Sequence, residues 1–154
     1  MAETAVHLVD KIIPPVRIRQ YVLSVPIPLR YWMALGKKLL AGVHKIFASE
    51  VESFYTRKNK KERSGSVCCV GRFGGALNLN VHFHLLQIEG VYEARSSKTP
   101  KFKKRKAPSG HDIKNLVMII QEKIIKHLRR SGYLYRFCLD FPEGVKERAA
   151  QPTS

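Results

Sequence analysis

The sequence has few acidic residues and few cysteines. Its 154 residues include 12 Asp and Glu against 28 Lys and Arg, which gives a formal net charge of +16 at pH 7. A balance this basic favours a polyanionic partner, above all nucleic acid. The three cysteines, Cys68, Cys69 and Cys138, form no Cys-x-x-Cys pair. Their spacing therefore excludes a zinc knuckle or ribbon and is typical of reduced thiols in a cytosolic protein.

Long apolar runs are also missing. No stretch approaches the roughly 20 apolar residues that a membrane-spanning helix needs, and the first residues lack the charged-then-apolar layout of a signal peptide. We therefore expect a cytoplasmic protein with no membrane partner. Hydrophobic residues still make up 44% of the chain, which is enough for one domain with its own core.

The segment 77–85 alternates between apolar and polar residues, as a strand with two unlike faces does. The polar positions are Asn78, Asn80, His82 and His84. Two imidazoles at i and i+2 lie about 6.5–7 Å apart along a strand, close enough for both to hold one divalent cation. The alternative is a solvated strand face that tolerates histidine. Asn is depleted in strands, which favours a functional face.

Two basic clusters flank this segment. Either can be explained without a ligand, since cations near a helix C-terminus complement its dipole and a bare charge run is often a solvated loop. Both are also candidates for nucleic-acid contact, and Phe102 within the second could anchor a strand or stack on a base. The first cluster is Arg57, Lys58, Lys60 and Lys61, and the second is Arg95, Lys98, Lys101, Lys103, Lys104, Arg105 and Lys106.

Apolar spacing and turn residues predict an α+β fold, an antiparallel sheet with helices packed on one face, as in ferredoxin-like folds. The histidines are expected on a central strand, on the face away from the helices. We divide the chain into an N-terminal helix (1–15), a core (16–132) and a partly disordered tail (133–154). Helices are predicted over 2–13, 29–58 and 109–130, and strands over 17–25, 66–73, 77–88 and 91–94, the last three as a β-meander.

The histidine segment and its surroundings resemble a known family. Arg72-Phe-Gly-Gly-Ala-Leu-Asn-Leu-Asn-Val-His-Phe-His-Leu-Leu, with Glu89-Gly-Val-Tyr, is similar to the His-hydrophobic-His (HUH) region of two-tyrosine, rolling-circle insertion-sequence transposases. Gln20-Tyr-Val-Leu-Ser-Val-Pro resembles the strand that precedes that region. The resemblance covers about residues 1–130.

The resemblance implies a mechanism and a site. His82 and His84 would hold one Mg²⁺ or Mn²⁺, which would polarise the scissile phosphate of single-stranded DNA for attack by a tyrosine. Arg72, Asn78 and Asn80 would contact the DNA near the metal, and the basic clusters would contact its backbone. By this resemblance, we expect the family's N-terminal cysteine module and its downstream catalytic tyrosine segment to be missing from this chain. Tyr133 and Tyr135 are expected to be ordinary packing residues.

We therefore expect an internal fragment of an HUH transposase that binds DNA but lacks the nucleophile and does not cleave it. Two alternatives stay open. One is a non-catalytic nucleic-acid-binding module whose histidines line a solvated face. The other is a decayed remnant that leaves apolar surface uncovered.

Overall fold

The computed structural model describes residues 7, 14–57, 59, 61–75, 78–93 and 100–134. The helix expected over residues 2–13 lies outside this part of the chain, apart from His7, which is helical. Lys58, Lys60, Arg95, Lys98 and the tail beyond residue 134 also lie outside it. The division into helix, core and tail therefore stays a prediction.

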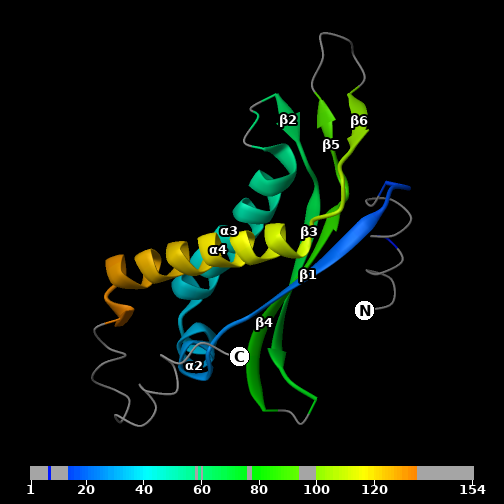
Figure 1. The fold of residues 1–154 in the computed structure, drawn as a ribbon. Helices are drawn as coiled ribbons and strands as arrows, with labels where there is room; N and C mark the ends of the chain where they lie inside the picture. The colour runs from blue at the N-terminus through cyan, green and yellow to red at the C-terminus, as the bar shows by residue number, and fades with distance from the viewer. Residues whose placement is uncertain are drawn as a thin grey trace.

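The histidine strand is the middle strand of an antiparallel sheet. The sheet contains β1 (Ile18–Ser24), β3 (Ser66–Phe73) and β4 (Leu79–Ile88), in the order β1-β4-β3 (Figure 1). Val81, Phe83 and Leu85 of β4 are completely buried, whereas His82 and His84 between them are half-buried on the other face. The predicted alternation and the central position of this strand are confirmed.

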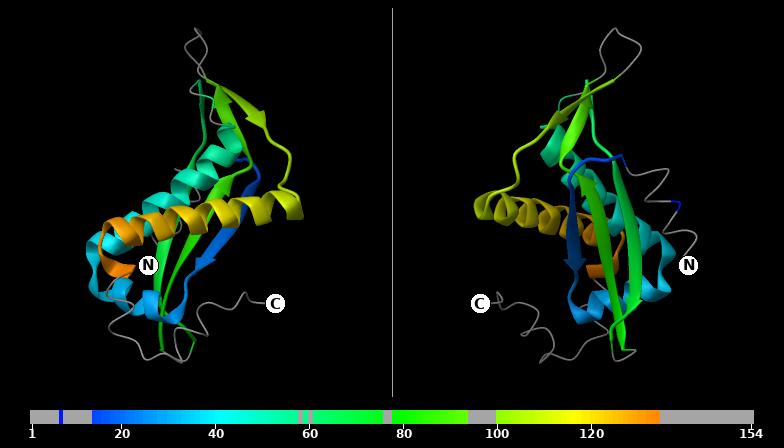
Figure 2. Two further views of the ribbon diagram at one scale, coloured as in Figure 1. Left: turned by 60° about the vertical axis from the view of Figure 1, so that its left-hand side comes forward. Right: turned by 90° about the vertical axis from the view of Figure 1, so that its right-hand side faces the viewer.

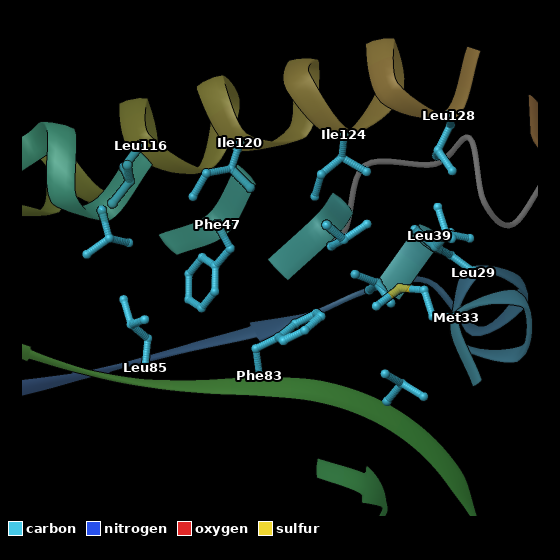
Figure 3. Packing of buried hydrophobic residues seen from close by; sticks show 14 of the residues in the cluster. Leu29, Met33, Leu39, Phe47, Phe83, Leu85, Leu116, Ile120, Ile124 and Leu128 are labelled. Carbon is cyan, nitrogen blue, oxygen red and sulfur yellow. The ribbon is translucent and has the colours of Figure 1, made fainter. Parts of the chain in front are cut away.

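Three helices pack on one face of this sheet, as an α+β fold requires. They are α2 (Ile27–Leu35), α3 (Lys37–Thr56) and α4 (Gly110–Arg130) (Figure 2). Figure 3 shows Phe83 and Leu85 of β4 pointing toward Phe47 of α3 and Ile120 of α4. Burial of this cluster is the main force that holds the helices on the sheet. The histidine face remains without a helix among the described residues.

The helix predicted over 29–58 is wrong in one respect, because Gly36 divides it into α2 and α3. Gly36 is extended (φ −102°, ψ 91°), and its N–H donates to Trp32 O. A Cβ at this position would lie 2.9 Å from Trp32 O and 3.0 Å from the Tyr133 hydroxyl, so only glycine allows the chain to turn here. Tyr31 of α2 is 55% exposed, since this helix buries Leu29 and Met33.

A second small sheet continues from the first and overturns the predicted β-meander. It contains β2 (Glu62–Arg63), β5 (Gly90–Glu93) and β6 (Lys101–Lys104), in the order β2-β5-β6. Buried Glu89 separates β4 from β5. Its N–H donates to Arg17 O and its carboxylate pairs with Arg19 at 2.6 Å. This anchoring redirects the chain, so that β5 pairs with β2 and β6 rather than with β4.

The last helix, α4, begins as the sequence predicts. Ser109 forms a capping box with Asp112, and the hydrogen bonds from Ser109 lower the pKa of the Asp112 carboxyl. The buried side chains of α4 are Leu116, Ile120, Ile124 and Leu128, whereas Val117 is 53% exposed. None of the helices in the described residues is long and apolar enough to cross a membrane.

Candidate metal centre and nucleic-acid interface

His82 and His84 lie side by side on the open face of the β1-β4-β3 sheet. Their ring centroids are 4.8 Å apart and the rings meet edge to face. In the strand register, His84 lies between Val22 of β1 and Cys69 of β3. His82 lies between Ser24 and Gly71. The neighbours of His82 are thus small, which leaves room above the sheet at this point.

The orientation of His82 is fixed by two contacts. Its Nδ1 lies 2.6 Å from the carbonyl oxygen of Asn80. A carbonyl oxygen only accepts hydrogen bonds, so Nδ1 carries the proton and Nε2 of the neutral ring carries the lone pair. The ring lies over Gly71, where a Cβ would come within 2.5 Å of Nε2. Only glycine at position 71 leaves space for this ring.

His84 is oriented by Gln20, a residue that the sequence analysis did not assign to the site. Gln20 Nε2 lies 2.6 Å from His84 Nδ1, which accepts a hydrogen bond from it in this arrangement. Since the amide oxygen and nitrogen can exchange places by a half-turn, the oxygen can accept a proton from Nδ1. In that arrangement both histidines present an unprotonated Nε2. Gln20 lies in the strand predicted over 17–25, but the sequence does not show which other strand this one pairs with.

The donor atoms on this face fit a weakly held, largely hydrated divalent ion. The described residues contain no group of three or more His, Cys, Asp or Glu side chains that could enclose a metal. Two imidazole nitrogens would therefore be the main protein ligands of such an ion. Asn80 lies on the same face, and its Oδ1 is buried with no hydrogen-bond partner in the described structure. Imidazole favours Mn²⁺ over Mg²⁺, which prefers oxygen.

The other residues predicted near the histidines are separated from them. Asn78 is exposed at the tip of the β3–β4 hairpin, next to Gly74. The guanidinium of Arg72 extends toward α2, where Nη1 lies 3.5 Å from Ala34 O. Of the predicted group, the structure therefore brings together Asn80, His82 and His84.

The basic candidates divide into exposed and structural residues. Arg105 is structural: it pairs with buried Glu62, donates to Tyr55 O at 3.1 Å, and its side chain is 14% exposed. This explains its position without a ligand. The exposed members of the two predicted basic clusters, within the described residues, are Arg57, Lys61, Lys101, Lys103, Lys104 and Lys106. Contrary to the loop interpretation, the three lysines at 101, 103 and 104 belong to β6.

None of the tyrosines in the described part of the chain lies beside the histidines. The hydroxyls of Tyr21 and Tyr55 are 3.0 Å apart on the helix side of the sheet, and burial raises the pKa of both. Tyr133 packs on Trp32 with ring centroids 5.8 Å apart, as expected of a packing residue. Tyr92 lies on β5, eight residues from His84. Tyr135 lies outside the described residues.

A comparison with protein-family models supports the transposase part of the sequence resemblance. Residues 65–140 match the family model described as "Putative transposase". The matched segment contains β3, β4, β5, β6 and α4, and with them both histidines. The match supports a transposase-related function for this part of the chain. Comparisons with curated proteins and with solved structures found no match.

Proposed function

We propose, from the transposase family that residues 65–140 match, that the chain binds single-stranded DNA on the open face of its main sheet. In this proposal His82 and His84 hold one Mn²⁺ or Mg²⁺. The observation that carries it is the pair of imidazoles, 4.8 Å apart, each held through Nδ1 on a face that no described helix covers.

The residues of this face have distinct roles in the proposal. Asn80 and Gln20 orient the two rings, and Gly71 makes room for His82. A bound divalent ion would act as a Lewis acid on a phosphate oxygen. Exposed lysines of β6 and neighbouring cations would neutralise backbone phosphates, which gives affinity with little sequence preference.

We further propose that the described chain binds DNA without cleaving it. A covalent phosphotyrosine needs a hydroxyl in line with the phosphate. Tyr21 and Tyr55 are paired on the helix side, and Tyr133 packs on α2. These positions favour an HUH-type protein that binds without cleaving over a complete nickase.

Fluorescence anisotropy of a labelled oligothymidylate tests the binding. We expect the purified chain to bind the single strand more tightly than a duplex of equal length, with a further gain on addition of Mn²⁺. The variant His82→Ala, His84→Ala should keep the ion-independent binding and lose the gain. Failure of the wild-type chain to bind any single strand would contradict the proposal.

A denaturing gel tests the absence of cleavage. A labelled oligonucleotide incubated with the chain and Mn²⁺ should migrate unchanged. A protein–DNA band that survives denaturation, and disappears with Tyr133→Phe or Tyr135→Phe, would show that the C-terminal residues supply a nucleophile.

A further inference from the structure

The open face of the sheet leads into an apolar hollow where β4 passes into β5. The hollow has a volume of about 400 Å³. Strands of both sheets contribute to it, so it exists only because β5 leaves the first sheet and enters the second. Its walls include Ile18, Val67, Leu86, Ile88, Arg63 and Tyr92.

The hollow directly adjoins the histidine pair. Side chains of a strand alternate between faces, so His82, His84 and Leu86 lie on the same face of β4. Leu86 is therefore about 6.5–7 Å from His84 along the strand. Val67 is the register partner of Leu86 on β3, and Gln20 is its partner on β1. Gln20 thus stands between the hollow and the histidines.

The far side of the hollow is aromatic and basic. Tyr92 pairs in register with Phe102 of β6, with ring centroids 5.2 Å apart. Arg63 pairs with Tyr92 from the other side, which places the three side chains in one cross-strand row. Lys104, two residues from Phe102, lies on the same face and is exposed.

We propose that this hollow binds a nucleobase of the single-stranded DNA whose backbone passes the histidine pair. The inference rests on the proposed function. A base offers apolar faces that fit aliphatic walls and an aromatic side chain, and its phosphates fit flanking cations. The hollow discriminates single strands from duplexes, because a paired base must leave its stack to enter.

Two oligonucleotides with equal charge separate base binding from backbone binding. One is an oligothymidylate, and the other is an abasic strand of the same length. We expect the wild-type chain to prefer the strand with bases. Ile18→Asn makes one wall polar without changing charge and should lower the preference about five-fold or more, since one base contact contributes about 1–3 kcal/mol. Binding of the abasic strand should not change.

A matched control and a second variant distinguish a loss of base binding in the hollow from misfolding of the chain. Ile119→Asn alters an isoleucine of α4 with 44% exposure, against 41% for Ile18, and should leave the preference unchanged. Tyr92→Leu, which keeps an apolar side chain, should lower it as Ile18→Asn does. A preference that survives both Ile18→Asn and Tyr92→Leu would overturn the hollow as a base site and leave the proposed function standing. No binding of either strand by wild type would overturn both.

Discussion

The two faces of β4 differ in what their side chains do. On the covered face, Val81, Phe83 and Leu85 are fully buried and hold the helices on the sheet. On the open face, His82 and His84 are half-buried and oriented by polar neighbours. Alternation along this ten-residue strand thus places the core-packing side chains on one face and the proposed metal ligands on the other. Substitutions on one face should therefore leave the properties of the other nearly unchanged.

The largest effect, on the free energy of unfolding, is expected from a substitution on the covered face of β4. Phe83→Ala removes a fully buried ring that contacts Phe47 and His44, and should lower the free energy of unfolding by about 3–5 kcal/mol. His84→Ala on the open face should cost no more than about 1 kcal/mol. Urea unfolding of both variants measures this difference. Equal decreases in the two variants would mean that the two faces are not separable.

The next largest effect, on Mn²⁺ affinity, is expected from the residue that orients His84. Gln20→Leu keeps the size of the side chain but removes the amide that holds Nδ1, and should weaken Mn²⁺ binding about 10- to 100-fold, as removal of an outer-shell partner does. Gln20→Glu should retain binding, because a carboxylate accepts the Nδ1 proton. Calorimetric titration measures both. Wild-type affinity in Gln20→Leu would show that Gln20 has no part in the site.

How far the sequence predicts this arrangement depends on the range of the contacts. Alternation over 79–85 and the start of the helix predicted over 109–130 are local patterns, and both are confirmed. Apolar residues recur at helical spacing on both sides of Gly36, so the sequence does not show the break between α2 and α3. The break depends on the packing of Trp32 and Tyr133 beside Gly36. Gln20 meets His84 across 64 positions of the chain. Such register depends on the packed sheet and not on local sequence.

A smaller effect is expected at Gly71. A Cβ there would overlap the His82 ring, so Gly71→Ala should displace the ring and lower Mn²⁺ affinity about tenfold. Gly65→Ala is the matched control, because its Cβ would meet only Ile88 Cδ1, at an ordinary 3.7 Å. Equal affinities for the two variants would show that the position of the His82 ring does not matter.

The smallest effect concerns the cations of β6. Replacing Lys101, Lys103 and Lys104 by Ala should make the log–log salt dependence of single-strand binding shallower by about 0.7 for each phosphate that the protein no longer neutralises. A control with an equal reduction of charge replaces Lys37, Lys114 and Lys126, which are exposed on the helices. If both triple variants change the slope alike, net charge and not the β6 surface determines binding.

Titration of Mn²⁺ followed by electron paramagnetic resonance tests the central claim most directly. Free Mn²⁺ gives a strong signal that decreases on binding, so the measurement needs neither DNA nor activity. We expect one weak site in the wild-type chain, since two imidazoles leave the ion mostly hydrated, and no such site in the variant His82→Ala, His84→Ala. Equal binding by the two proteins, or no binding by the wild type, would contradict it.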